Sequence, residues 1–253
     1  MVSYNRIGSL TDKKDSGKLH WKLMKTATKK RMDHNGEPQR SRSDLRLEES
    51  RVAELLDIAS RVFLANGFAG ASMNEIARLS NSSKTTFYAR FPTKEKLFIA
   101  VMERRMDTVL GEVTAPLPAG SPIDVALKEY GTRFLRFALS DDQIALLRII
   151  SMESVRFPEL GERFYELGPK RGQTFLAGYL QEQIKLGHLL KDDPWTMAEH
   201  LVSLLSGGPV RWTVLGLQTA TRTREKQQEH IARALKVFLR AYGATTALAL
   251  QKG

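Results

Sequence analysis

A short run of hydroxyl-bearing and basic residues, Ser83-Lys84-Thr85-Thr86, is the most chemically suggestive segment of this chain. Serine and threonine hydroxyls at the start of a helix can reach base edges or phosphate oxygens, and a threonine methyl can contact a thymine methyl. Lys84 and Arg90 add positive charge beside these hydroxyls. Together these residue types predict contact with nucleic acid.

Two short helices joined by a tight turn would position these side chains. Ser72 with Glu75 three residues later fits a capping box and predicts the start of the first helix. Asn81 tolerates left-handed geometry, so the turn at 81–83 should end that helix. Ser83 then caps a second helix over residues 84–90. This arrangement is that of a helix-turn-helix, whose second helix enters the major groove of DNA.

The segment, with the helix before it, resembles the DNA-binding domain of the TetR family of bacterial transcriptional regulators. The resemblance covers Glu48 to about Thr108 and departs from the family pattern at Asn81-Ser82 and Ala89. The residues that carry it are Asn66-Gly67-Phe68, Ser72, Ile76-Ala77, Ser83-Lys84, Phe87-Tyr88, Phe91, Lys94-Glu95 and Leu97.

The resemblance implies phosphate contacts by Tyr88 and Lys94 and a backbone contact by Ser72. Each residue also has a purely structural interpretation: Ser83 as a cap only, Tyr88 as a packing residue, Lys94 as a solvated charge. With the chemistry above, the predicted DNA-binding residues are Ser72, Ser83, Lys84, Thr85, Thr86, Tyr88, Ala89, Arg90 and Lys94.

Composition restricts the other classes of function. The 253 residues include no cysteine, which excludes disulfides and thiolate chemistry. No apolar run is long enough for a membrane span, so a cytoplasmic protein without membrane contact is expected. The five histidines show no metal-ligand spacing, and neither a phosphate-binding glycine loop nor a nucleophile elbow is present. We therefore expect no enzyme activity, no cofactor and no metal.

The net charge of +11 is concentrated at the beginning of the chain. Residues 1–47 hold twelve Lys/Arg against five Asp/Glu, and their apolar residues follow no helical or strand period. This composition predicts a disordered basic arm. The arm is either a solvated tail, including a stretch upstream of the natural start, or a segment that binds phosphates or a minor groove.

Helical periodicity continues beyond the predicted DNA-binding domain, assigned to residues 48–108. The helix over about 141–155 is apolar nearly all round and is expected to be buried. Gly207-Gly208-Pro209 should kink a helix that starts at Pro194. We expect a regulatory and dimerisation domain at 109–242, with a tail at 243–253. The segment 153–169 resembles the AefR-like subgroup of TetR C-terminal domains.

The family resemblance implies a homodimer through helices at 194–217 and 223–242. On the second of these helices the residues assigned to the interface are Ile231, Ala234, Leu235, Phe238 and Leu239, whose alternative role is packing within the chain against the helix expected at 169–186. It also implies an unknown small-molecule effector. Large adaptable apolar side chains predict its pocket, with Arg148 binding either an acidic group of the ligand or a carboxylate such as Glu153. The candidates, each of which could instead be ordinary core, are Met102, Met106, Phe134, Phe137, Arg148, Met152, Phe175 and Trp212.

The predicted fold class is all-α: an N-terminal three-helix helix-turn-helix DNA-binding domain and a C-terminal helical dimerisation and ligand-binding domain. The expected function is sequence-specific binding of a double-stranded DNA operator, with repression relieved by the effector. Activation stays open, and an architectural DNA-binding protein without effector response is the alternative. The sequence identifies neither operator, effector nor target genes.

Overall fold

The computed structural model describes residues 42–118, 120–217 and 223–244, and in this part of the chain the fold is all-helical, as predicted. The chain divides into two compact units between Arg51 and Val52, within the first described helix. The helices are α2 (Arg42–Gly70), α3 (Met73–Leu79), α4 (Lys84–Arg90), α5 (Lys94–Val113), α6 (Ile123–Ala138), α7 (Asp141–Glu153), α8 (Pro158–Leu167), α9 (Pro169–Lys185), α10 (Pro194–Ser206), α11 (Pro209–Val214) and α12 (Arg224–Tyr242).

The first helix starts at Arg42 rather than at Glu48, so residues 42–47 are helical instead of disordered. These residues contain no Gly or Pro, and Arg and Leu are good helix formers. The rest of the predicted arm lies outside the described residues. At the other end, Gly67 has φ 70° and ψ 174°, a conformation available to glycine that interrupts the regular helix.

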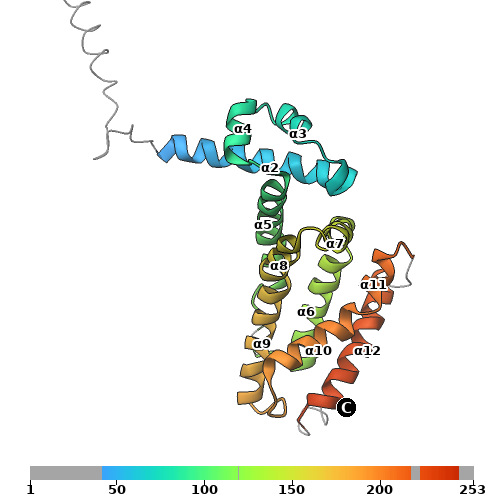
Figure 1. The fold of residues 1–253 in the computed structure, drawn as a ribbon. Helices are drawn as coiled ribbons and strands as arrows, with labels where there is room; N and C mark the ends of the chain where they lie inside the picture. The colour runs from blue at the N-terminus through green and yellow to red at the C-terminus, as the bar shows by residue number, and fades with distance from the viewer. Residues whose placement is uncertain (1–41, 119, 218–222, 245–253) are drawn as a thin grey trace, which may run out of the picture. The chain divides into compact units, whose positions relative to one another are not determined.

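An aromatic cluster joins α2 to α5. The rings of Phe63 and Phe98 meet edge to face with centroids 4.9 Å apart, and Phe68 meets Phe98 in the same way at 5.4 Å. All three side chains are buried, and α3 and α4 add Ile76 and Phe87 to the same core. Figure 1 shows the consequence, with α3 and α4 held at one end of the long helix α5.

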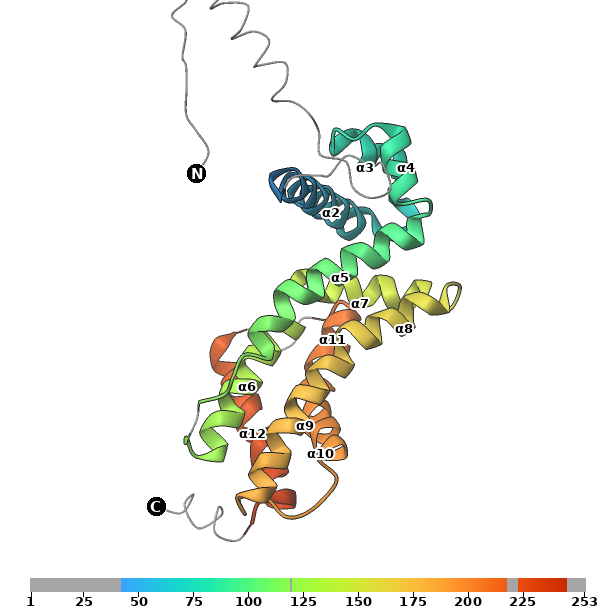
Figure 2. The ribbon, with the colours of Figure 1, turned by 90° about the vertical axis from the view of Figure 1, so that its left-hand side faces the viewer.

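A second core holds α6, α10 and α12 together (Figures 1 and 2). The apolar stripe of α12 lies inside this core, so assigning that stripe to a dimer interface was wrong. The alternative, packing within the chain, is correct, but the main partners are α6 and α10 rather than the helix at 169–186. The stripe residues are all at most 5% exposed, namely Ile231, Ala234, Leu235, Phe238 and Leu239.

Two further expectations about the helices have different outcomes. The glycines interrupt the helix where a kink was expected: Gly207 and Gly208 keep right-handed helical angles but separate α10 from α11, which ends at Val214 rather than at Leu217. Complete burial of the helix at 141–155 was wrong, because Met152 is 75% and Val155 86% exposed. The helix ends at Glu153, so Val155 lies in the following turn.

The predicted tail begins with an ordered contact, since Gly243 pairs with Leu189 in an isolated bridge. None of the described helices combines the length and the apolar character that a membrane-spanning segment needs.

Candidate DNA interface and effector cavity

The turn between α3 and α4 has the predicted geometry. Asn81 adopts φ 50°, the left-handed conformation that asparagine tolerates. The Ser80 hydroxyl donates to the Ser82 hydroxyl at 3.1 Å, so a polar bond holds the turn at a position where this chain departs from the family pattern. The turn is therefore compatible with the departures from the family pattern.

Serine caps fix the start of both short helices. Ser72 Oγ accepts from the backbone N–H of Glu75 at 3.4 Å, and Ser83 Oγ accepts from that of Thr86 at 3.1 Å. The hydroxyls of Ser83 and Thr86 also share a 2.8 Å hydrogen bond. Each cap satisfies a backbone donor that would otherwise lack a partner, and so positions the following side chains.

The recognition helix α4 has one buried and one exposed face. Phe87 and, just after the helix, Phe91 are buried against the core of the N-terminal helices. The exposed side chains are those to which the sequence assigned DNA contact, namely Lys84, Thr85, Thr86, Tyr88, Ala89 and Arg90. The arrangement presents a polar, positively charged surface on a rigid apolar support.

Tyr88 is linked to the neighbouring helix α3. Its hydroxyl donates to Oδ1 of Asn74 at 3.1 Å, and its ring meets Phe87 edge to face at 5.4 Å. The protein therefore orients both the hydroxyl and the ring of Tyr88, while 36% of the residue stays exposed. Sequence reasoning missed Asn74, because a lone polar residue on a helix surface gives no signal of its partner.

Lys94 is less free than the sequence suggested. Its amine donates to the carbonyl oxygens of Phe68 and Ala69 at 2.9 and 3.1 Å, and it lies 5.2 Å from the centroid of the Phe68 ring. These contacts hold the irregular end of α2 against the start of α5. A structural role for Lys94 is therefore visible, alongside any contact with phosphate.

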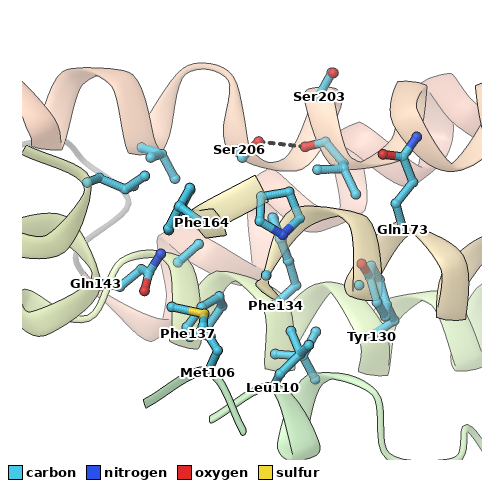
Figure 3. Close-up of a pocket in the computed structure, with 18 of the residues that line it drawn as sticks. Met106, Leu110, Tyr130, Phe134, Phe137, Gln143, Phe164, Gln173, Ser203 and Ser206 are labelled. Atoms are coloured by element: carbon cyan, nitrogen blue, oxygen red, sulfur yellow. Dashed lines mark hydrogen bonds between the residues drawn. The ribbon is translucent and has the colours of Figure 1, made fainter. Parts of the chain in front are cut away.

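A cavity of about 260 Å³ lies between α5, α6, α9 and α10 (Figure 3). This volume is near the lower end of the range for ligand sites, roughly 300–1,000 Å³. Aromatic side chains line much of the cavity, and methionine, leucine and small polar residues complete the wall. The residues labelled in the figure are Met106, Leu110, Tyr130, Phe134, Phe137, Gln143, Phe164, Gln173, Ser203 and Ser206.

Two polar side chains of this wall are almost fully enclosed. Tyr130 is 1% and Gln143 5% exposed. Within the described parts of the chain, neither the Tyr130 hydroxyl nor the Gln143 side-chain amide forms a hydrogen bond, whereas Gln173 donates to the carbonyl of Trp195 at 3.3 Å. Burial raises the pKa of the Tyr130 hydroxyl well above its usual 10.0, so the group stays neutral.

Three of the eight residues predicted for the pocket line this cavity: Met106, Phe134 and Phe137. The other five lie elsewhere. Met102 belongs to the core of the N-terminal helices, and Phe175 packs against the other core. Met152 is exposed, and Trp212 is exposed beside Arg211. Arg148 donates to the carbonyls of Val214 and Thr213, both at 2.8 Å, so it contacts neither Glu153 nor the cavity.

A polar cleft lies between α2, α5 and α7. Arg104 donates to both carboxylate oxygens of Asp57 at 2.7 and 2.8 Å, and this bond lowers the pKa of Asp57. Arg105 donates to Ser60 of α2 at 3.2 Å and to Asp142 of α7 at 3.1 Å. Helix α5 is thus bonded both to the DNA-binding helices and to the wall of the cavity.

Comparison with known proteins finds matches in two parts of the chain. Residues 55–101 match "Bacterial regulatory proteins, tetR family", and residues 125–244 match "AefR-like transcriptional repressor, C-terminal domain". RutR, an HTH-type transcriptional regulator of Escherichia coli O157:H7, is 32% identical over 63% of this chain and 72% of its own length. The match to the HTH-type transcriptional activator FasR of Mycolicibacterium smegmatis is also 32% identical but spans only 43% of FasR.

Solved structures extend the similarity over most of the fold. A chain assigned to the TetR family, from Mesorhizobium loti MAFF303099, has a TM-score of 0.73 and 26% identity, covering 81% of this chain and all of that one. The Flavonoid-responsive Regulator FrrA has a TM-score of 0.66 and 33% identity, covering 78% of this chain and 99% of its own. The chain therefore belongs to the TetR family of DNA-binding transcriptional regulators and carries a C-terminal domain of the AefR-like repressor type.

Proposed function

We propose that this regulator is a cytoplasmic homodimeric repressor that leaves its operator when a small molecule enters the cavity between α5, α6, α9 and α10. The proposal rests on the hydrogen bonds of Arg105 on α5. This side chain bonds to Ser60 of α2, in the DNA-binding domain, and to Asp142 of α7, next to the cavity residue Gln143. Regulators of this family are not enzymes. In this proposal the exposed surface of α4 binds DNA and the cavity binds the effector.

The proposed DNA-binding domain comprises residues 48–108, and the proposed regulatory domain comprises residues 109–242. Lys84, Thr85 and Thr86 would contact bases or phosphates, because they are exposed at the start of α4. Tyr88 would meet phosphate in the orientation that Asn74 imposes. Ser72, Ser83, Ala89, Arg90 and Lys94 would complete the surface.

An architectural DNA-binding protein is the competing function. The enclosed cavity favours a regulator, since an architectural protein needs no site for a small molecule. FrrA is described as flavonoid-responsive, which supports a small aromatic effector here. FasR is an activator, so the direction of regulation rests on the repressor-type C-terminal domain alone.

The proposed dimer uses the outward faces of α10 and α12 instead of the buried stripe. On α10 the exposed positions outside the cavity wall include Thr196 and His200, and Gly207 follows the end of the helix. On α12 the exposed Val237 and Ala241 are apolar. Two linked heads would then bind half-sites about 34 Å apart.

Selection of bound DNA from a random pool by the purified protein tests the proposal. The expected product is a palindromic sequence with two half-sites. Replacing Lys84 with Gln should lower affinity for that sequence and reduce the salt slope by about one per engaged phosphate, whereas K191Q, an exposed lysine of the regulatory domain, should change neither. Equal recovery of all sequences would instead indicate an architectural protein.

A further inference from the structure

The charge of the cavity wall restricts the ligand, provided that the proposed function holds. None of the side chains that line the cavity is Lys, Arg or His, and the only ionisable acid is Glu199, which is exposed. A buried carboxylate on a ligand would therefore find no cation to pair with, and such a charge is costly to enclose. Arg148, the residue expected to bind an acidic ligand, bonds to α11 instead.

The uncompensated polar groups of the wall restrict the ligand further. Figure 3 shows Tyr130 and Gln143 at opposite ends of the view, with Phe134 and Phe137 between them. The Tyr130 hydroxyl and the Gln143 amide form no hydrogen bond to the described protein, so each is available to bond a ligand atom in the cavity. Each can both donate and accept, so each suits a hydroxyl or carbonyl oxygen. The rings between them suit a flat apolar surface.

We propose that the effector is an uncharged, flat aromatic compound with an oxygen substituent near each end, bound through Tyr130 at one end of the cavity and Gln143 at the other. The phenylalanines contact the ring system. Because the cavity measures about 260 Å³, two or three rings fill it, and bulky glycosylated or multiply charged relatives of such compounds are excluded.

Three stilbenes of similar shape separate the effect of the oxygen substituents on binding from the effect of charge. 4,4′-Dihydroxystilbene has both oxygens, trans-stilbene has neither, and stilbene-4,4′-dicarboxylate carries two charges. Binding is measured by calorimetry or ligand fluorescence with the full-length protein, and operator release in parallel. The diphenol should bind at least about fivefold more tightly than the hydrocarbon, because its oxygens satisfy buried partners, and the dicarboxylate should bind least.

Variants then test the two polar residues. Y130F and Q143L should each weaken binding of the diphenol about fivefold or more while leaving trans-stilbene unchanged. Thermal stability should change little, because neither polar group bonds to the described protein. Y179F and Q181L, on α9 but outside the cavity wall, are the matched controls and should leave both affinities unchanged.

The outcomes distinguish this inference from the proposed function. If 4,4′-dihydroxystilbene, 4,4′-dihydroxybiphenyl and a dihydroxyflavone all fail to bind, or if the dicarboxylate binds best, the ligand class is wrong. Release of the operator by the dicarboxylate would still support a repressor. Conversely, tight diphenol binding that Y130F and Q143L weaken, without any effect on the operator, would support the ligand class and overturn the proposed effector response.

Discussion

At the scale of the residue, Lys94 shows how one cation can serve both fold and DNA. Its amine already bonds the carbonyls of Phe68 and Ala69, two groups left without helical partners because α2 ends at Gly70. Any phosphate contact would have to use the remaining donor or compete with these bonds. Stability and DNA affinity can therefore be separated experimentally at this position.

Replacing Lys94 with Met should lower the free energy of unfolding by about 1–3 kcal/mol, because two partly buried carbonyls lose a charged donor. Urea denaturation gives this value. K96M, which changes an exposed lysine on the same helix, is the control and should stay within about 0.5 kcal/mol of the original protein. If K94M keeps its stability and loses only operator affinity, Lys94 is a DNA contact alone.

The residues that could be predicted from the sequence are those with local partners. Ser72, Ser83 and Asn81 act within three residues along the chain, so their types reveal their roles. Tyr130 and Gln143 were missed because an aromatic residue on an apolar stripe and a glutamine near a helix start have common local interpretations. Only the packing of α6 and α7 with α5, α9 and α10 places them around one cavity.

At the scale of the element, α5 is the member through which a ligand could act on the DNA-binding head. Met106 and Gln143 line the cavity, and the adjacent residues Arg105 and Asp142 bond to each other. Arg105 also bonds Ser60 of α2, and its Nε is buried without a partner among the described residues. Movement of either wall helix would therefore strain this link.

Replacing Asp142 with Asn should weaken the coupling between ligand and operator. We expect the ratio of operator Kd values with and without 4,4′-dihydroxystilbene to fall about threefold to tenfold, within the usual range of allosteric coupling. D141N removes a neighbouring exposed acid of the same helix turn and should leave the ratio unchanged. Equal losses in both variants would assign the effect to the charge of the helix end, not to Arg105.

The crossing of α6 with α10 and α12 depends on a glycine. A Cβ at Gly131 would lie 3.1 Å from Ile231 and 3.3 Å from Leu205, whereas a Cβ at Gly178 of α9 would meet nothing within 4 Å. G131V should therefore destabilise the protein by about 1–3 kcal/mol through overpacking. G178V should be neutral or slightly stabilising, since valine is a better helix former than glycine. Calorimetric Tm values compare the two, and equal shifts would contradict close packing at Gly131.

Periodicity identifies the apolar face of a helix but not the surface that covers it. The bounds of α4 and the interruption at Gly207-Gly208 agree with the sequence because caps, prolines and glycines are local signals. The stripe of α12 has the same spacing whether a second copy or α6 covers it. That choice requires knowledge of which helices meet, and the structure assigns the stripe to the chain's own core.

At the scale of the whole molecule, the proposed dimer should depend on the outward face of α12. V237E places a charge at a position 54% exposed in the single chain, and V125E does the same on α6 at 49% exposed. Sedimentation should show that V237E alone yields monomers, with folding retained and operator affinity reduced. By contrast, L235E should unfold the protein, because Leu235 is buried in the core. An intact V237E dimer would place the interface elsewhere.

The basic arm supplies the last test of how the whole chain binds DNA. The predicted head from Glu48 to Glu95 contains six basic and six acidic residues, so its affinity depends on the placement of a few cations. Residues 1–41, which lie outside the described part of the chain, contain ten Lys/Arg against four Asp/Glu. Each phosphate that the arm neutralises should steepen the slope of log affinity against log salt by about 0.9.

Deleting residues 1–41, which leaves α2 intact, should flatten that slope by several units if half of the arm's cations engage in each subunit. Affinity should fall similarly for the operator and for unrelated DNA, because phosphate contacts carry little sequence information. Preference for the operator should survive, since it resides in the exposed residues of α4. Operator binding measured from low to high salt, for the full chain and the deletion, gives both quantities, and identical slopes would show that the arm does not bind DNA.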